Sequence, residues 1–568
     1  MREREWNISP VKADWIDSVC LETGICPILA TVLYQRNIRT PKDIYQFLSP
    51  RLDQIRSPFV LKDMDKAVNA ITEAILAHKK ILIFGDYDVD GITATAVMSQ
   101  FFTKIGADIT TYVPSRLKEG YGLRPEHIER AASDGICLII TVDCGSSSED
   151  AILCANKHGI GVIITDHHEI EAPLKGAVAI VNPKQAECES DLSFLSGVGV
   201  AYYVILALRK KLREKEYFIQ IPEPNLKDFC DLVALGTVAD VVPMIEENRI
   251  FTRVGLNLLK QNPRPGILAL MREARIHPFQ ICERDIAFSL APRLNAAGRV
   301  THAQESISLL IEEDPQNAEY LSEHLDRLNE ERRKIERVIL AEVQQQISET
   351  PELLDRHALV LYGQNWHQGV LGIVASRVSD QYRKPSLIFS IKDGLAKGSC
   401  RSGSGIDLYQ ALTNCSDLFI QFGGHANAAG VLLSEENIPA FIIRLEDTLA
   451  IQKEKLPEIA PVIIDCEIQL ADITPQLLEN LEQLQPFGPK NDEPLFMARD
   501  ISVVTNEIVG NRHLRIVIKE KNQKTTYTAI RFNYTELVEE KMFSKIAFHL
   551  RWNYWNGRKS PQLVLVDF

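Results

Sequence analysis

Three aspartates at alternate positions dominate residues 81–91, ILIFGDYDVDG: Asp86, Asp88 and Asp90. The apolar residues that open this segment are typical of a buried strand, and residues 93–102 are typical of a helix, so the aspartates should lie in a tight turn between them. Carboxylates crowded at the end of a strand repel one another unless a cation lies among them. An all-oxygen cluster suits magnesium, calcium or manganese. The simpler alternative is a solvated acidic turn or a helix N-cap.

Other apolar runs end in polar residues in the same way. One run ends in Asp143, another in Asp166, His167 and His168, and a third is followed by Arg116. Strand-like runs that alternate with helix-like segments predict a parallel sheet with helices on both faces. Ligands of such sheets bind beyond the carboxyl ends of the strands. We therefore expect the acidic residues and histidines to converge with the three aspartates at one edge.

The pair His167-His168 has two interpretations. Adjacent side chains on an extended segment point to opposite sides, so at most one of these rings binds a given metal directly and the other can face the substrate. Asp166, just before them, can orient a ring from behind. Two adjacent histidines in a loop are also common as surface polar residues.

Asp240 follows the largely apolar residues 232–238. A lone aspartate in such a run is costly to bury without a partner. It could cap a helix or bind backbone amides, or it could be a metal ligand. The repeated pattern of acidic residues at strand ends favours a ligand at the same sheet edge.

Composition limits the class of protein. The 568 residues suggest three or four domains, and a net charge of −13 counts against a protein that coats nucleic acid through bulk charge, although not against a local basic groove. No stretch reaches the ~20 apolar residues of a membrane span, and the N-terminus lacks the apolar region of a secretory signal. The eleven cysteines are scattered without a C-x-x-C pair, which indicates reduced thiols in the cytoplasm.

Two later segments have the composition of anion sites. Residues 397–402, KGSCRS, combine two cations with hydroxyls and free amides, and residues 422–430, FGGHANAAG, place His425 among small residues. The second segment could cradle an anion at a helix start. Its small residues could equally serve only to let a helix pack closely. Between these segments and the acidic cluster, residues 314–350 predict a long helix with Asp314 as N-cap, which we interpret as a connector between domains.

The character of the chain changes after about residue 461. Alternation in residues 513–519 and 546–552, with a hairpin signal at Asn556-Gly557, predicts a small antiparallel β domain. Aromatic and basic side chains gather there and could stack bases and contact phosphates, or could pack the core. They are Arg551, Trp552, Tyr554, Trp555, Arg558 and Lys559.

Four segments, DYDVDG, TVDCG, TDHH and TVADVVP, occur in this order and together resemble the DHH phosphoesterase superfamily. Within it the chain resembles the RecJ family of single-strand-specific exonucleases. Many relatives carry a histidine four positions before the first aspartate of the D-x-D pair. Counted back from Asp88, that position is Phe84 here, which fits the RecJ branch and not the pyrophosphatase branch. The resemblance extends from about residue 20 to the end.

The resemblance implies an α/β protein with five segments. These are an N-terminal helical segment (1–60), a DHH catalytic domain with a parallel sheet (61–312), a connector helix (313–352), a second, substrate-binding α/β domain (353–455) and an OB-fold-like nucleic-acid-binding domain of antiparallel strands (456–568).

The implied activity is metal-dependent 5′→3′ exonuclease hydrolysis of single-stranded DNA to 5′-mononucleotides, in DNA repair and recombination. Two divalent cations, Mn²⁺ or Mg²⁺, are expected, with Asp143 as the bridging ligand and His168 on the scissile phosphate. The expected ligands are Asp88, Asp90, Asp143, His167 and Asp240, with Asp86 and Asp166 behind them.

The same resemblance implies how the strand is held. In the family, a segment like residues 291–299, APRLNAAGR, closes the catalytic domain near the cleft, although a turn with surface arginines is the local alternative. The expected DNA contacts are Arg116, Arg293, Arg299, Arg377, Arg401, Ser402, Gly423, Gly424 and His425. A single-strand-binding protein and a helicase are candidate protein partners, no membrane is involved, and a monomer is expected.

Two other functions remain open on the sequence. One is a DHH enzyme of short oligonucleotides, cyclic dinucleotides or pyrophosphate, against which the C-terminal β domain counts. The other is a binding protein that has lost catalysis, against which the complete set of acidic residues and His167 counts.

Overall fold

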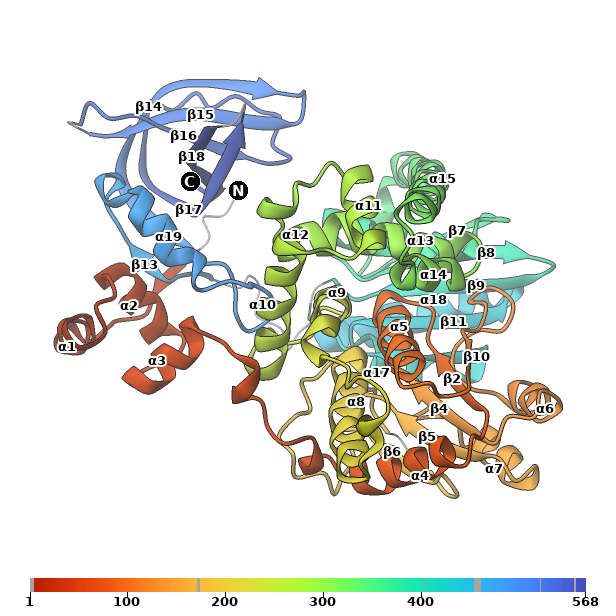
Figure 1. Cartoon of the computed structure of the whole chain (residues 1–568). Coiled ribbons are helices and arrows are strands. Elements are labelled where there is room, and N and C mark those ends of the chain that lie inside the picture. Colours follow the sequence, from red (N-terminus) through yellow and green to blue (C-terminus); the bar gives the residue numbers. More distant parts are fainter. Residues whose placement is uncertain (1–4, 171–173, 404, 454–460, 522, 556–557) are drawn as a thin grey trace. The chain divides into compact units, whose positions relative to one another are not determined.

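The computed structural model describes residues 5–170, 174–403, 405–453, 461–521, 523–555 and 558–568 (Figure 1). It divides into two compact units, each built from segments that are distant in sequence. The terminal unit comprises Met1–Arg56, Val241–Val254 and Ile459–Phe568, and the central unit comprises Ser57–Asp240 and Gly255–Glu458. Within the described ranges, no single helix is long and apolar enough to cross a membrane; only the pair Ala13–Thr23 and Pro27–Gln35, bent by 117° between them, is long and apolar enough together.

The central unit begins with a five-stranded parallel sheet. Its order is β3 (Ile109–Tyr112), β2 (Ile81–Gly85), β4 (Leu138–Val142), β5 (Gly161–Thr165) and β6 (Ala179–Val181). Helices α4 (Met64–Leu76), α5 (Val89–Lys104) and α8 (Gly197–Glu214) cover one face, and α6 (Pro125–Ser133) and α7 (Glu149–Lys157) cover the other. The predicted parallel sheet with helices on both faces is confirmed.

More helices complete this first part of the central unit. They are α9 (Cys230–Ala239), α11 (Pro265–Glu273), α12 (Glu283–Asp285), the π-helical turn Ile286–Leu290, α13 (Ala291–Val300) and α14 (Gln304–Ile311). Helix α10 (Glu246–Gln261) contributes residues to both units. Residues 232–238 are therefore helical. Asp240 is the C-cap residue of α9, so the helix-end alternative describes its backbone position, and the pattern of acidic residues at strand ends does not extend to it.

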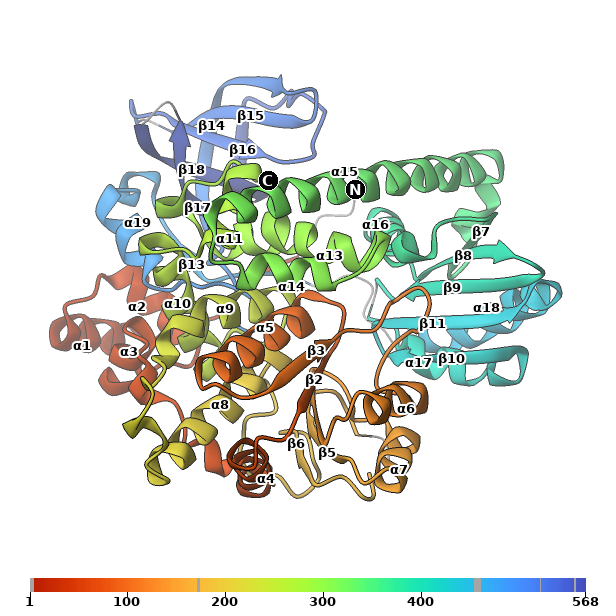
Figure 2. The ribbon, with the colours of Figure 1, turned by 45° about the vertical axis from the view of Figure 1, so that its right-hand side comes forward.

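A 35-residue helix, α15 (Pro315–Glu349), joins the two parts of the central unit (Figure 2). Its predicted N-cap is confirmed, since Asp314 accepts a hydrogen bond from the backbone N–H of Asn317. The N-terminal half packs on α11 and α13, and the C-terminal half packs on α16 (Leu371–Tyr382). The predicted connector is thus an integral part of both cores.

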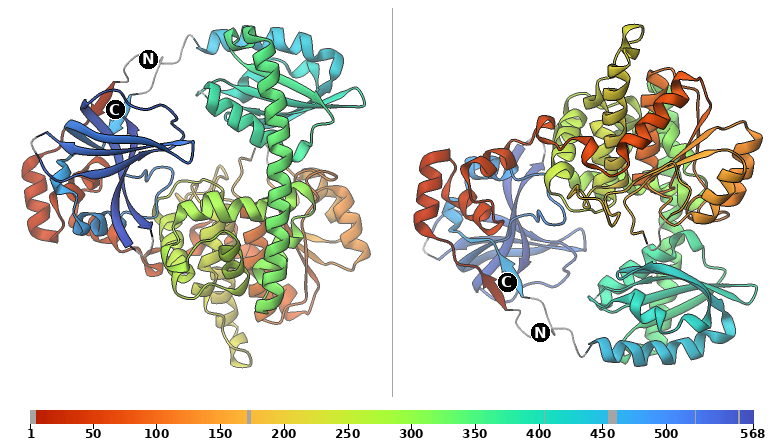
Figure 3. Two further views of the ribbon diagram at one scale, coloured as in Figure 1. Left: turned by 90° about the horizontal axis from the view of Figure 1, so that it is seen from above. Right: turned by 90° about the horizontal axis from the view of Figure 1, so that it is seen from below.

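The second part is a mixed five-stranded sheet. Its order is β10 (Phe419–His425), β11 (Ala428–Ser434), β9 (Leu395–Arg401), β8 (Ser386–Lys392) and β7 (Leu359–Gln364), with only β7 and β8 parallel. Helices α15 and α16 cover β7 and β8 on one face, while α17 (Leu408–Thr413) and α18 (Ile438–Lys453) cover the opposite face (Figure 3). On the first face, β9, β11 and β10 carry small and polar residues that stay partly or fully exposed.

The C-terminal strands form a closed barrel in the terminal unit. The order is β13 (Cys466–Glu467), β14 (Phe496–Val509), β15 (His513–Glu520), β16 (Tyr527–Arg531), β18 (Arg558–Asp567) and β17 (Met542–Trp555), and β14 also pairs with β17. Closure removes the exposed edges of the sheet. The predicted β domain is confirmed, although β16 and β18 pair in parallel. The turn predicted at Asn556-Gly557 lies outside the described residues.

The N-terminal helices share the core of this barrel. Helices α1 (Ala13–Thr23), α2 (Pro27–Gln35), α3 (Pro41–Leu48) and α19 (Pro475–Glu482) contribute to one buried cluster with Phe548 of β17, through Ile16, Leu29, Ile44 and Leu477 respectively. Strand β1 (Trp6–Ile8) pairs with β12 (Val462–Ile464). The two ends of the chain are thus one folded unit, which the sequence did not predict.

Candidate active site

The candidate site lies where the order of the parallel sheet reverses. Strand β2 is followed in the chain by β3 on one side, whereas β4 and β5 continue on the other side. Such a switch point opens a crevice at the carboxyl ends of the strands. The turn after β2 carries Asp86, Asp88 and Asp90, the turn after β4 carries Asp143, and the turn after β5 carries His167.

The turn after β2 is shaped by its own aspartates. Helix α5 starts at Val89, earlier than predicted, because Asp88 caps it by accepting hydrogen bonds from the backbone N–H groups of Asp90 and Gly91. Gly91 is required there, since a Cβ would lie 2.5 Å from the carbonyl oxygen of Asp86. The N-cap alternative for this segment therefore holds for Asp88, and the cap directs the other aspartates inward.

Asp90 is held by the first turn of α8. Its two carboxylate oxygens accept hydrogen bonds from the N–H groups of Gly197 (2.6 Å) and Val198 (2.9 Å). A Cβ on Gly197 would lie 2.3 Å from Oδ1 of Asp143, so glycine is needed where the helix meets both carboxylates. The sequence did not identify this helix start. Its signal was Ser196, an N-cap residue, followed by the glycine-rich GVGV.

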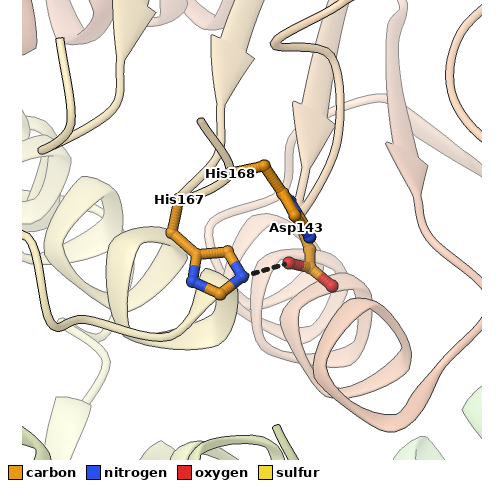
Figure 4. A group of neighbouring side chains, drawn as sticks. All are labelled: Asp143, His167 and His168. Carbon is orange, nitrogen blue, oxygen red and sulfur yellow. Dashed lines mark ion pairs between the residues drawn. The ribbon is translucent and has the colours of Figure 1, made fainter. Parts of the chain in front are cut away.

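His167 points its unprotonated nitrogen at three carboxylates. Its Nδ1 lies 3.0 Å from the carbonyl oxygen of Leu195, which can only accept, so the ring proton is on Nδ1. Nε2 lies 3.2 Å from Oδ1 of Asp143, 3.6 Å from Oδ2 of Asp240 and 3.8 Å from Oδ2 of Asp90. Figure 4 shows the ring of His167 facing the carboxylate of Asp143.

Burial and mutual repulsion dominate the electrostatics of this group. Burial, and then the charges of neighbouring aspartates, raise the pKa of Asp90 to about 7 and that of Asp240 to about 9, and raise the pKa of Asp143 well above its ordinary value. Burial lowers the pKa of His167 to about 3. The imidazole is therefore neutral at physiological pH and does not neutralise the carboxylates.

These atoms match the demands of a divalent cation. Among the described residues, Nε2 of His167, Oδ1 of Asp143 and Oδ1 of Asp86 are buried without a hydrogen-bond partner. Three overlapping groups have ligand atoms within 4.8 Å of one another. They are Asp90-His167-Asp240, Asp86-Asp88-Asp143 and Asp143-His167-His168. Acceptor atoms that face one another without donors require positive charge between them, so the residues fit a divalent metal.

His168 stays close to this group: its ring centre lies 4.6 Å from that of His167, so the two adjacent rings do not point to opposite sides as expected. Its Nδ1 lies 2.7 Å from Asp166, whose oxygens also accept the N–H groups of Ser146, His167 and His168. Burial opposes the charged form of His168, but the hydrogen bond and charge of Asp166 raise the pKa of the ring to about 9. Burial would raise the pKa of Asp166, but His168 and its other donors lower it well below its usual range. Asp166 therefore uses its carboxylate to hold the loop of the two histidines in place.

Four arginines from four elements gather beside the acidic group. Burial, and then the charges of Arg116, Arg332 and Arg401, lower the pKa of Arg299 to about 9. Arg299 lies on α13 and donates to the carbonyl oxygen of Gly369 at 3.0 Å, while Arg401 ends β9. These cations thus come from both parts of the central unit. Arg332 was missed, although its signal was the gap that it makes in the apolar stripe of α15.

The other predicted DNA contacts do not join this cluster. Arg293 is ion-paired with Asp326 at 2.8 Å, and Arg377 with the buried Glu336 at 2.6 Å. Residues 422–430 form the hairpin of β10 and β11, so the predicted helix start is wrong. Strand β9 is paired on both sides, so its amides are not free, and the N–H of Ser402 donates to Asn427.

The hairpin nevertheless presents an open face. In register across β9, β11 and β10, Arg401 lies beside Ala428, and Ala428 lies beside His425. The next row on this face is Ser399, Gly430 and Gly423. His425 and Gly423 are exposed, whereas Gly424 faces the next strand with a φ of 147°. Arg401 and His425 thus flank a floor of small residues.

The aromatic residues of the barrel divide between two environments. Trp552 packs against the barrel core, and Tyr554 is 44% exposed. Lys559 lies over both rings, and Arg551 is ion-paired with Glu493. The side chains of Trp555 and Arg558 lie outside the described residues.

Comparison with known proteins agrees with this architecture. The sequence matches the DHH family, N-terminal domain over residues 80–237, the DHHA1 domain over 355–450 and the RecJ OB domain over 464–567. It is 34% identical to the single-stranded-DNA-specific exonuclease RecJ of Bacillus subtilis, over 99% of this chain and 70% of that protein. It is also 34% identical to the Escherichia coli protein of the same name, over 96% of each chain.

Solved structures show the same relationship. The structure of RecJ from Thermus thermophilus in complex with Mn²⁺ superposes with a TM-score of 0.83 at 28% identity, over 100% of this chain and 80% of that one. The Mg²⁺ complex of that protein gives a TM-score of 0.76. Identity above 30% along nearly the whole chain, the same three domains and a buried acidic group at the switch point lead to one conclusion: the chain belongs to the RecJ family of the DHH phosphoesterase superfamily.

Proposed function

We propose that this protein is a metal-dependent 5′→3′ exonuclease that hydrolyses single-stranded DNA to 5′-mononucleotides, in DNA repair and recombination. One observation carries the proposal: the lone pair of a neutral, buried His167 faces the carboxylates of Asp90, Asp143 and Asp240 with no donor between them. A bound cation stabilises such an arrangement at neutral pH, because it relieves the repulsion that raises the pKa values of these carboxylates. The names of the relatives from B. subtilis and E. coli support the substrate, and the family resemblance supports the polarity.

Two cation positions, for Mn²⁺ or Mg²⁺, fit the geometry. Asp90, His167 and Asp240 would hold one ion, and Asp88 and Asp143, with Asp86 close by, would hold the other. Oδ1 of Asp143 lies 3.2 Å from Nε2 of His167 in the first set, and Asp143 groups with Asp86 and Asp88 in the second, which supports its assignment as the bridge. Bound divalent cations would supply a water of lowered pKa and stabilise the charge on the phosphate oxygens.

His168 is suited to contact the scissile phosphate. Because Nδ1 binds Asp166 and the ring has a raised pKa, Nε2 carries a proton at neutral pH. A charged imidazole can donate to a phosphate oxygen and stabilise the negative charge that grows there during hydrolysis. Asp166 keeps the ring charged and oriented while it does so.

The strand would be held by phosphate contacts and by a flat surface. Arg116, Arg299 and Arg401 are close enough to influence one another electrostatically and would bind phosphates next to the acidic group. The floor of small residues between Arg401 and His425 leaves room for a sugar-phosphate backbone or a base. In the terminal unit, the exposed ring of Tyr554 beside Lys559 is suited to stack a base of single-stranded DNA.

The remaining expectations belong to the same proposal. A cytoplasmic monomer that works with a single-strand-binding protein and a helicase fits an enzyme that needs unpaired strands. Copurification and size-exclusion experiments would test these partners and the oligomeric state.

The decisive experiment uses single-stranded DNA labelled at either end, with Mn²⁺ or Mg²⁺. Immediate release of the 5′ label as a mononucleotide, abolished by a chelator and by Asp90→Ala, is the expected result. Release of the 3′ label first would refute the polarity. Binding without release under either metal would make the protein a binding module, and preferential hydrolysis of dinucleotides would make it a small-substrate enzyme.

A further inference from the structure

The loop between β3 and α6, residues 113–124, carries two side chains that reach the candidate active site. The guanidinium carbon of Arg116 lies 4.9 Å from the ring centre of Tyr87, between the aspartates of the first turn. The hydroxyl of Tyr121 lies 3.2 Å from Nδ1 of His168. The positions of Arg116, which would bind a phosphate, and of Tyr121, which contacts His168, therefore depend on the conformation of one loop.

Glu119 ties this loop to the elements on both sides of it. Its Oε1 accepts a hydrogen bond from the hydroxyl of Tyr112, in β3, at 2.6 Å, and its Oε2 accepts one from the backbone N–H of Ser115 at 2.6 Å. Oε1 also lies 3.3 Å from Nε2 of His127, in α6. One carboxylate thus joins strand, loop and helix.

The third contact is a directed hydrogen bond. The backbone N–H of Arg124 donates to Nδ1 of His127 at 3.0 Å, so the ring proton is on Nε2 and is donated to Glu119. The ring is buried against Phe84, with centroids 5.0 Å apart. Burial would raise the pKa of Glu119, but its donors lower it, so the carboxylate is charged at neutral pH. Hydrogen bonds to a charged acceptor are the stronger kind.

The loop between these anchors is a tight turn. The N–H groups of Glu119 and Gly120 both donate to the carbonyl oxygen of Ser115, and Gly120 and Gly122 have φ values of 79° and 82°. The turn places Arg116 and Tyr121 on either side of Glu119. A carboxylate at its centre can therefore fix both side chains at once.

We propose that Glu119 is a positioning residue for the reaction, which holds Arg116 against the strand phosphate and Tyr121 against His168. The expected effect on DNA rests on the proposed function. The statement that Glu119 holds the loop 113–124 in place does not depend on it. Glu119 itself touches neither metal nor substrate. Its loss should weaken DNA binding through Arg116 and slow turnover through Tyr121, without unfolding the protein.

The first test needs neither metal nor activity. Hydrogen–deuterium exchange of the peptide 113–124 is measured in the full-length protein with chelator present. We expect exchange about tenfold faster in Glu119→Ala than in the wild type, because three charge-assisted hydrogen bonds are lost. The matched control is Glu129→Gln, which removes the same charge from an exposed site of α6 and should exchange like the wild type. Unchanged exchange in Glu119→Ala would overturn the proposal.

The second test asks whether Glu119 acts through Arg116. The Kd for single-stranded DNA is measured by anisotropy in chelator. We expect Glu119→Ala to raise the Kd about tenfold and to lower its salt slope by about one phosphate contact. In an Arg116→Ala background the same change should alter the Kd less than twofold, because the two losses are not additive. A tenfold rise in Kd on adding Glu119→Ala to the Arg116→Ala variant would refute the proposal that Glu119 positions Arg116. So would an unchanged Kd when Glu119→Ala is made in the wild type.

Two further comparisons distinguish failure of this proposal from misfolding of the variant and from failure of the proposed function. If Glu119→Ala does not fold, Tyr112→Phe removes one donor at lower cost and should show a smaller increase in both exchange and Kd; no increase in either would refute the proposal. If the wild-type protein shows no nuclease activity, the proposed function fails, while the exchange and binding measurements still decide the role of Glu119.

Discussion

The substitution Gly197→Ala should disturb the geometry of the acidic group much more than it lowers the stability of the fold. The added Cβ would lie 2.3 Å from Oδ1 of Asp143, whereas ordinary contact begins at 3.4 Å, so the carboxylate must move by about 1.1 Å (3.4 minus 2.3). It is then displaced from Nε2 of His167, now 3.2 Å away. The backbone φ of Gly197 is not in the left-handed region, so alanine itself is tolerated in the helix.

The expected consequence is a large loss of rate with a modest loss of stability. A misplacement of about 1 Å costs on the order of 100-fold in kcat, which is about 2.7 kcal/mol of activation free energy. Overpacking costs about 1–3 kcal/mol of folding free energy, partly offset by the better helix propensity of alanine. The Mn²⁺ affinity should fall in parallel, because the displaced oxygen is a proposed ligand.

The assay is release of a 5′ label from single-stranded DNA across a Mn²⁺ titration, with thermal unfolding as the stability measurement. Gly199→Ala is the matched control, since its Cβ would lie 3.2 Å from the Ser196 hydroxyl and not near a carboxylate. We expect its kcat to stay within about threefold of the wild type. A Gly197→Ala variant with wild-type kcat and Mn²⁺ affinity would refute the reasoning that Asp143 must sit where the structure places it.

Three other predictions test separate parts of the structure. Arg299→Ala and Arg401→Ala should each raise the KM for single-stranded DNA and reduce the salt slope of DNA binding by about one. Arg293→Ala, which loses an ion pair, should mainly lower the Tm. Equal salt slopes in all three variants would contradict this prediction. The raised pKa of Asp240, about 9, means that the folded state favours its neutral form, so stability is present at low pH and is lost as pH rises towards 9. In the presence of chelator, the Tm of the protein should therefore be lower at pH 9 than at pH 6. Saturating Mg²⁺ should reduce this difference in Tm, and a Tm that does not depend on pH would refute the prediction. Deleting residues 461–568 should leave helices α1 to α3 without their core and expose them to protease, so intact N-terminal helices in the truncated protein would count against a shared core.

The N-terminal helices show a limit of sequence reasoning. Trp15 and Phe47 both pack against the main cluster of the terminal unit. That cluster is completed by barrel residues more than 400 positions further along the chain, such as Phe548. Apolar periodicity marks the face that a helix buries, but it contains no information about which distant face covers it.

The sequence was enough to predict the parallel sheet, the long helix, a C-terminal β domain and the strand ends that carry most of the acidic residues. It could do so because strand and helix periods, caps and turns are local, and because parallel topology places the carboxyl ends together. Tertiary structure alone decided that Asp240 approaches His167 from the end of a helix, that α8 binds Asp90, and that residues 422–430 form a hairpin. It also decided that Arg293 pairs with Asp326, that Arg332 and Arg377 share Glu336, and that Arg332 nevertheless lies close enough to Arg299 to lower its pKa. The physical reason is that an arginine or aspartate has the same local signature whether it meets a substrate or a neighbouring side chain, and only packing selects the partner.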